Sequence, residues 1–176
     1  MCNERGTFQT FSDTFFYSIT EKVPGRILDE FTESAQLIKS VLNTLDAIHS
    51  TPISGEKYGH WDETGKGSHD TWKAHLLELL TYNQKDLETK KCADWLERSV
   101  VDELTKKFVA LVEYCPETRH LLHADFESSN TLSDGEKITG VIDWANAKYG
   151  DPVFDIAWID FWKEKIDYKG AFEKHL

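Results

Sequence analysis

The sequence has few cysteines, fewer basic than acidic side chains, and no long apolar run. Cys2, Cys92 and Cys115 are odd in number and far apart, so neither a disulfide framework nor a zinc knuckle is expected, and a reducing cytoplasm is favoured. No run of about 18 apolar residues is present, which predicts that no helix spans a membrane. The polar N-terminus also lacks the apolar segment of a secretory signal.

Basic residues are outnumbered, with 20 Lys and Arg against 31 Asp and Glu, and the formal net charge is −11. A nucleic-acid partner is therefore not expected, because phosphates require a basic face. An acidic surface could attract a cationic substrate, although many cytosolic proteins are acidic for solubility alone. The chain has 176 residues, 40% of them hydrophobic, which is enough for one globular domain with a core.

In the first part of the chain, apolar spacing predicts one strand and one long helix. Residues 1–13 are polar and are expected to be irregular. Residues 14–21, TFFYSITE, are rich in aromatic and β-branched side chains and predict a strand that ends at the Val-Pro-Gly of 23–25. Apolar residues recur every three or four positions over 28–48, which predicts one amphipathic helix. The Gly-rich stretch 50–70 is expected to be a loop.

In the second part, the pattern predicts two helices, a short strand, a hairpin and a final helix. One helix begins near residue 71, and the next spans about 92–114. A strand follows at 119–123, and a hairpin at 130–142. Asp151 and Pro152 are typical of a helix start. The expected fold is α+β, a mainly helical body with a small β-hairpin. The positions expected to face the core are Trp72, Leu76, Leu79, Leu80, Trp95, Leu104, Phe108, Leu111, Val112, Ile156, Ala157, Ile159 and Phe161.

Three oxygen-bearing side chains are expected to meet at one end of the hairpin. Asp125 lies on a loop that leaves an apolar strand, Asn130 opens the next strand, and Asp143 closes the partner of that strand. A turn near Glu136 and Lys137 brings both strand ends back together. Mg²⁺ prefers oxygen ligands, and phosphoryl transfer needs a base beside the acceptor hydroxyl and metal ligands that screen the phosphates. Asp125 suits the base, and Asn130 and Asp143 suit the metal.

These residues belong to a longer series of motifs. H-x-D-x-x-x-x-N at 123–130, I-D-W at 142–144 and G-D-P-x-x-D at 150–155 follow one another in the order found in aminoglycoside phosphotransferases. Protein kinases share the first two elements in the form H-R-D-x-x-x-x-N and D-F-G. The chain therefore resembles the kinase-like aminoglycoside phosphotransferase family, and most closely its members that phosphorylate hygromycin B.

The resemblance implies an enzyme that uses ATP (or GTP) and Mg²⁺ to phosphorylate a hydroxyl of a small cationic acceptor, an aminoglycoside such as hygromycin B, with antibiotic resistance as its role. It makes Asp125 the catalytic base, and Asn130 and Asp143 the magnesium ligands. Glu127 stands where protein kinases place a Lys, and is expected to contact the acceptor. The adenine-facing hinge is expected at Thr20, Glu21 and Lys22, and structural support of the site at His123, Trp144 (a core plug), Asp151 (a helix cap) and Asp155 (a brace of the catalytic loop).

The resemblance also implies that the N-terminal lobe is largely missing. Neither a Gly-rich phosphate loop nor a strand Lys with a helix Glu partner is recognisable before the hinge. The expected organisation is a remnant of that lobe with the hinge strand over residues 1–25, and a catalytic C-lobe, truncated at its C-terminus, over 26–176. Such a chain is expected to be weakly active or inactive unless the missing lobe is encoded separately.

Other readings stay open at this stage. The chain could be a non-catalytic remnant or binding module of the same fold, or a related kinase of the choline, homoserine or macrolide type. A metal hydrolase built on His120, His123 and Asp125 would hold zinc or iron, although two histidines three residues apart on a strand face opposite sides. The remaining internal histidines, expected at the surface, are His49, His60, His69 and His75.

Overall fold

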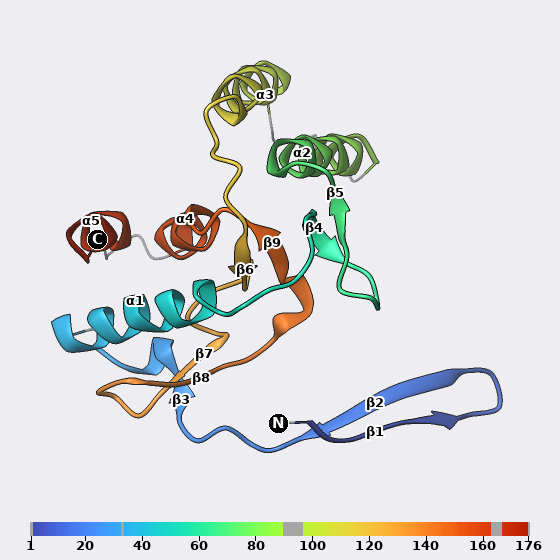
Figure 1. Ribbon diagram of the computed structural model, residues 1–176, viewed down its shortest axis with the longest axis vertical. Coiled ribbons are helices and arrows are strands. Elements are labelled where there is room, and N and C mark those ends of the chain that lie inside the picture. Colours follow the sequence, from blue (N-terminus) through green and yellow to red (C-terminus); the bar gives the residue numbers. More distant parts are fainter. Residues whose placement is uncertain (1, 33, 90–96, 163–166, 176) are drawn as a thin grey trace.

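The computed structural model describes residues 2–32, 34–89, 97–162 and 167–175, and within these ranges the chain has an α+β fold (Figure 1). The strands are β1 (Cys2–Gln9), β2 (Thr14–Thr20), β3 (Arg26–Ile27), β4 (Tyr58–Trp61), β5 (Gly67–His69), β6 (His120–Leu122), β7 (Thr131–Ser133), β8 (Ile138–Val141) and β9 (Lys148–Gly150). The helices are α1 (Ala35–His49), α2 (Trp72–Thr89), α3 (Arg98–Val112), α4 (Val153–Trp162) and α5 (Tyr168–His175), with 3₁₀ turns at Leu28–Glu30 and Trp144–Asn146.

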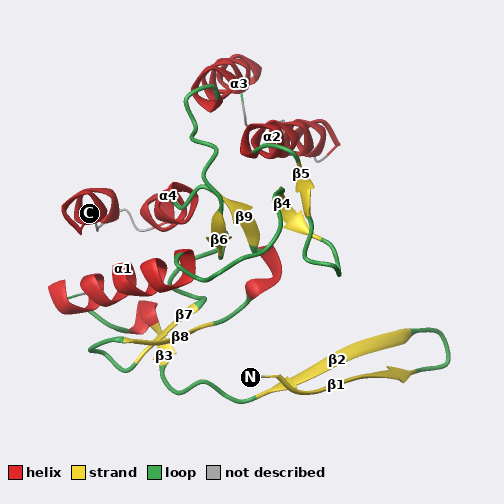
Figure 2. Cartoon of the chain, viewed as in Figure 1, coloured by secondary structure: helices red, strands yellow, loops and turns green. Residues whose placement is uncertain are grey.

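The strands form three antiparallel sheets, in the orders β1-β2, β3-β7-β8 and β5-β4-β9-β6. The third sheet lies in the middle of the body, with α1, α4 and α5 toward one end and α2 and α3 toward the other (Figure 2). The chain therefore contains more β-structure than the strands at 14–21 and 119–123 and the hairpin at 130–142 that were expected. None of the described helices is long and apolar enough to cross a bilayer.

The N-terminal segment forms a hairpin that projects from the body (Figure 1). The strand expected from residue 14 is confirmed as β2, but the expectation that 1–13 are irregular was wrong, because β1 pairs with β2. The aromatic rings of Phe8 and Phe15, which are partners in this register, stack with centroids 5.1 Å apart. A strand must satisfy its backbone donors and acceptors, and the preceding segment supplies the nearest partner.

The long helix expected over 28–48 is interrupted. A 3₁₀ turn occupies Leu28–Glu30, and α1 begins only at Ala35 because Ser34 caps it, its hydroxyl accepting a hydrogen bond from the Leu37 N–H at 3.1 Å. Leu28 is nevertheless buried in the same core as α1. The apolar spacing therefore continues across a break in the helix.

Ser34→Ala is expected to lower the free energy of unfolding by about 1 kcal/mol, because the Leu37 N–H loses its acceptor. Urea denaturation measures the change. Ser50→Ala is the control, since Ser50 is exposed at the other end of the same helix. Equal stability of the two variants would show that the cap does not contribute.

The Gly-rich stretch 50–70 is not a simple loop. It contains β4 and β5, which pair with each other, and β4 also pairs with β9 through Gly59 and Tyr149. The partner in β9 lies about 90 residues further along the chain, so local sequence gives no sign of it. The expectation of a loop was therefore wrong.

The helices expected from about residue 71 and after Pro152 are confirmed as α2 and α4, and Asp151 caps α4 by accepting a hydrogen bond from the Val153 N–H at 3.2 Å. Of the helix expected over 92–114, the structure describes Arg98–Val112 as α3.

Several expected core positions are wrong. Leu104, Leu111 and Phe161 are 59%, 56% and 73% exposed, and Ala157 is also exposed. Trp95 lies outside the described residues. The two leucines belong to α3, which among the described elements packs mainly against α2 (Figure 1). Much of the apolar face of α3 therefore remains exposed.

Two clusters of buried side chains form the core. One joins α1 to the loop between β6 and β7, to α4 and to α5. It contains Leu28, Leu37, Val41, Leu42, Leu45, Ile48, Phe126, Ile156, Ile159 and Tyr168. The other joins α2 and α3 to β6, and contains Trp72, Leu76, Val112, Leu122 and Ala124. The segment from β6 to β7 contributes to both clusters, which fixes the loop that carries the candidate site.

Candidate functional site

The loop of residues 123–130, between β6 and β7, is anchored by a buried carboxylate from α4. Asp155 has no exposed side-chain surface. Its Oδ1 accepts a hydrogen bond from the Ala124 N–H at 2.7 Å, and its Oδ2 accepts one from the His123 N–H at 3.0 Å. The His49 ring, from α1, lies 2.9 Å from the same Oδ2 through Nε2. A single carboxylate therefore joins α1, α4 and the start of the loop.

Asp125 follows directly after this anchored pair of residues and is half-buried. Asn146, in the 3₁₀ turn after β8, donates an amide hydrogen bond to Asp125 Oδ2 at 3.1 Å. Ala124 has a left-handed backbone (φ 61°), which reverses the chain just before Asp125. Asn146 orients one carboxylate oxygen, and sequence reasoning missed it because a lone Asn beyond the I-D-W motif gives no local signal of its partner.

Lys148 of β9 is a second neighbour that the sequence did not reveal. Its side chain is buried and its Nζ lies 5.1 Å from the Phe154 ring centroid. Burial lowers the pKa of Lys148, while the negative charges of Asp155 and Asp125 act in the opposite direction. Both site carboxylates therefore favour the charged form of Lys148.

Asn130 and Asp143 come from the end of the β7–β8 hairpin nearest the loop. The Asn130 side-chain amide donates to the backbone oxygen of Asp125 at 3.0 Å, and the backbone oxygen of Asn130 accepts from the Ile142 N–H at 2.9 Å. This pairing places Asp143 beside the same end, where its side chain is exposed and its backbone is left-handed (φ 61°). The hairpin expected from the sequence is confirmed, and it brings these segments together.

His123 links the loop to β8. Its buried ring lies 3.0 Å from the Ile142 oxygen through Nε2, and it contacts the Trp144 ring edge-on at 4.7 Å. Trp144 is 40% exposed and donates its indole N–H to the Val141 oxygen, so the expectation that it plugs the core was wrong. It instead covers one side of the His123 ring, because the 3₁₀ turn keeps it at the surface.

Glu127 is half-buried and its carboxylate accepts a hydrogen bond from the Ser129 hydroxyl within the loop. Thr20, at the end of β2, is exposed, and so are Glu21 and Lys22, which follow it. The segment just after them lies against β8, where the Thr139 hydroxyl donates to the Pro24 oxygen at 2.5 Å. The expected hinge is therefore attached to the strand that leads to Asp143.

The histidines differ from expectation in two places. His49 and His75 were expected at the surface, and both are buried, His49 against Asp155. His120 contacts the His49 backbone oxygen through Nδ1, whereas His123 contacts Ile142. Within the described residues, His120, His123 and Asp125 do not bring their ligand atoms together as one metal-binding group, so the structure gives the hydrolase alternative no support.

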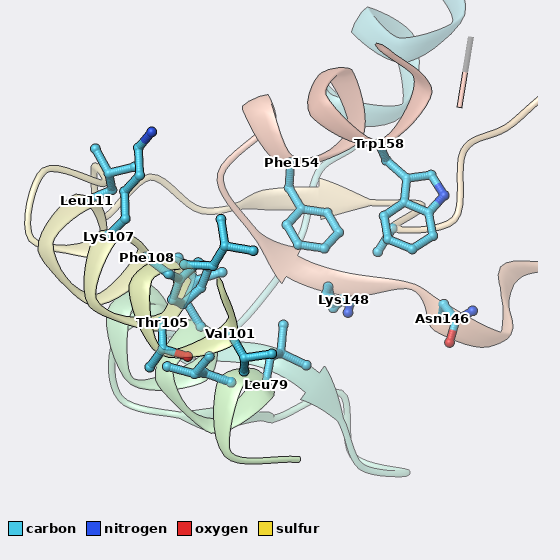
Figure 3. A pocket seen from close by; sticks show the side chains of 14 residues that line it. Leu79, Val101, Thr105, Lys107, Phe108, Leu111, Asn146, Lys148, Phe154 and Trp158 are labelled. Carbon is cyan, nitrogen blue, oxygen red and sulfur yellow. The ribbon is translucent and has the colours of Figure 1, made fainter. Parts of the chain in front are cut away.

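A pocket of about 870 Å³ lies between α2, α3 and α4 (Figure 3). Ala124, which precedes Asp125, and Asn146, which donates a hydrogen bond to Asp125, form part of the pocket wall. Asp125 therefore lies next to the pocket. The wall is otherwise mainly apolar and includes Leu79, Phe108 and Trp158, with the two cations Lys107 and Lys148. None of its described lining residues is a carboxylate.

Comparison with known proteins gives consistent matches. The family model described as "Phosphotransferase enzyme family" matches residues 5–167. The hygromycin-B 4-O-kinase of Escherichia coli is 33% identical over 156 residues, which are 87% of this chain and 45% of that protein. The chain thus spans about half the length of this relative.

Solved structures of phosphotransferases also match this chain. A ternary complex of a thermostable mutant of aminoglycoside phosphotransferase APH(4)-Ia with AMP-PNP and hygromycin B matches with a TM-score of 0.72 and 27% identity, covering 97% of this chain and 59% of the other. The apo form matches with a TM-score of 0.73 and 27% identity, covering 99% and 59%. Macrolide 2′-phosphotransferase type I matches with a TM-score of 0.56 and 14% identity, covering 92% and 53%, which shows a common fold alone.

Proposed function

Because the chain belongs to the phosphotransferase enzyme family, whose members are ATP-dependent, we propose that it carries the catalytic residues for moving the γ-phosphoryl of a nucleoside triphosphate onto a hydroxyl of a small acceptor. An aminoglycoside such as hygromycin B is the first candidate acceptor, with antibiotic resistance in the cytoplasm as the role. The observation that carries the proposal is Asp125, held beside a pocket on a loop that Asp155 anchors.

Asp125 is the proposed general base. The Asn146 amide holds Oδ2, so Oδ1 is the oxygen proposed to take the proton of the acceptor hydroxyl. A fixed carboxylate loses little freedom in the reaction, which favours the geometry of proton transfer. His123, Asp151 and Asp155 act in this proposal as supports, since each bonds to backbone around the site.

Asn130 and Asp143 are the proposed ligands of Mg²⁺, and the residues present fit that ion. The Asn130 amide nitrogen is used by the Asp125 backbone, which leaves its carbonyl oxygen as the ligand atom, and Asp143 supplies an exposed carboxylate. Both are the oxygen donors that Mg²⁺ prefers. When bound, the ion would screen the negative charge of the nucleotide phosphates.

Asp143→Asn is expected to weaken MgATP binding at least about 10-fold without loss of stability, because Asn tolerates the left-handed backbone while removing the charge. Asp143→Ala should weaken binding equally and also lose about 1 kcal/mol of stability. Calorimetric titration and urea denaturation measure the two effects. Unchanged MgATP affinity in both variants would exclude Asp143 as a ligand, and no binding by the wild type would favour a non-catalytic remnant.

The proposed organisation follows the family. Residues 26–176 form the catalytic C-lobe, and residues 1–25 form the strand and hinge that lead to it, with Thr20, Glu21 and Lys22 facing the adenine. The attachment of Pro24 to Thr139 supports this placement, because it holds the hinge segment against β8. Glu127 is proposed to contact the acceptor from the loop.

The apolar pocket favours a second candidate acceptor. A polycation would find no carboxylate among the described residues of its wall and would meet Lys107 and Lys148. A hydroxylated acceptor with a large apolar surface, of the macrolide type, fits this lining better. The overall charge of −11 favours the cationic acceptor instead, through long-range attraction.

Transfer of phosphate from labelled ATP to hygromycin B and to a macrolide tests the proposal. The 176-residue chain should be assayed alone and after fusion to the N-terminal lobe of the Escherichia coli kinase. We expect slow transfer alone and faster transfer in the fusion. Transfer at the background rate to both acceptors in both proteins would contradict the proposed function.

A further inference from the structure

His75, in the first turn of α2, is buried without a polar partner. Its side chain is 1% exposed, and neither ring nitrogen has a hydrogen-bond partner in the part of the chain that the structure describes. Buried polar atoms are normally paired, and an unpaired one destabilises the fold. A metal ion is a partner that an imidazole nitrogen commonly takes.

The surroundings hold the His75 ring in one orientation. Trp72 stacks on it with centroids 5.2 Å apart and planes at 26°. The ring of His69 approaches edge-on at 5.2 Å. A Cβ placed on Gly59, whose φ is +79°, would lie 2.7 Å from His75 Nδ1 and 3.1 Å from His69 Nδ1, so the glycine provides the space beside both rings.

A carboxylate completes the cluster. Glu78 follows His75 by three residues on α2 and therefore shares its face of the helix. Its Oε2 lies 3.0 Å from His69 Nε2. One ligand atom from each of His69, His75 and Glu78 lies within 4.8 Å of the other two, and in the part of the chain that the structure describes no other His, Cys, Asp and Glu side chains form such a group.

We propose that His69, His75 and Glu78 bind one Zn²⁺ ion, with water in the fourth position. Two imidazole nitrogens and a carboxylate oxygen are a ligand set that zinc takes in proteins, whereas Mg²⁺ and Ca²⁺ prefer oxygen alone. Bonds of zinc length require ligand atoms about 3.4 Å apart, so the cluster must contract. His69 and Glu78 are 18% and 46% exposed and can rotate toward the fixed His75 ring. The nearby His60 does not belong to this group of ligand atoms.

The ion would tie the β4–β5 hairpin to α2, which begins just after β5 (Figure 1). Leu76 and Leu79, on the same helix, line the pocket beside Asp125. Zinc would therefore stabilise one wall of that pocket without contacting the reacting groups. The zinc site does not depend on the proposed function.

Calorimetric titration of the tag-free, chelator-treated chain with zinc chloride tests the site. The variants are His75→Leu and Glu78→Gln, with His175→Ala as the matched control, because His175 pairs with the single carboxylate of Asp46 elsewhere on the surface. His75→Leu is expected to fold, since it replaces an unpaired buried ring with an apolar side chain, and far-UV circular dichroism verifies this.

We expect the wild type and His175→Ala to bind one zinc per chain with equal affinity. His75→Leu should weaken binding at least about 100-fold, and Glu78→Gln at least about 10-fold. Zinc should also raise the melting temperature of the wild type and not that of His75→Leu. Absence of zinc binding at micromolar concentration, or an affinity unchanged in His75→Leu, would overturn the site. If His75→Leu does not fold, an unchanged affinity in Glu78→Gln overturns it.

Discussion

Asp125→Asn is expected to lower the rate of phosphoryl transfer by about 10²–10⁴-fold, because the amide cannot accept the proton of the acceptor hydroxyl. The substitution keeps the size of the side chain and its place on the loop that Asp155 anchors. The loss should therefore fall on kcat, with the acceptor KM and the free energy of unfolding nearly unchanged. The fusion with the N-terminal lobe of the Escherichia coli kinase is the protein to assay.

Two further variants make this result specific. Asn146→Ala removes the hydrogen bond to Asp125 Oδ2 and should reduce kcat by about 10-fold, since the base stays but loses its orientation. Asp134→Asn, in the exposed β7–β8 turn, changes a carboxylate away from the site and should leave kcat unchanged. Full activity of Asp125→Asn would exclude Asp125 as the base.

Asp155→Ala is expected to destabilise the chain by about 3–5 kcal/mol, the largest effect on stability predicted for this protein. It leaves the buried N–H groups of His123 and Ala124 without their acceptor and removes the partner of His49. Urea denaturation followed by circular dichroism measures the loss.

The control for this variant is Asp102→Ala, which removes an exposed ion pair with Arg98 on α3 and should change stability by no more than about 0.5 kcal/mol. A double-mutant cycle of Asp155→Ala with His49→Ala should show that the two losses are not additive, because the side chains are in contact. A loss below about 1 kcal/mol in Asp155→Ala would show that the loop does not rely on this carboxylate.

Local signals were sufficient for much of the fold. The β7–β8 hairpin, the start of α2 and the Asp151 cap of α4 were all expected, because each depends on residues close together in sequence. The pairings of β1 and β4 were missed. β1 has few of the β-branched and aromatic residues that predict a strand, and β4 pairs with β9, which lies far along the chain.

Burial was predicted less well than element type. Leu104 and Leu111 have the spacing of a buried helix face, yet both are exposed, because among the described elements too little packs against that side of α3. His49 and His75 carry no sequence signal of burial and are both enclosed. Periodicity predicts that a helix has an apolar face, whereas neighbouring elements decide whether that face is covered.

The sequence by itself determined the family of this protein and the order of Asp125, Asn130 and Asp143 along the chain, since motif spacing and a hairpin are local properties. Only the tertiary structure revealed that Asp155 and His49 anchor the loop of Asp125, and that Asn146 orients its carboxylate. It also revealed that His69 of β5 and Glu78 of α2 lie close to the buried ring of His75. Those contacts join separate elements, and the packing of helices on sheets brings them within bonding distance.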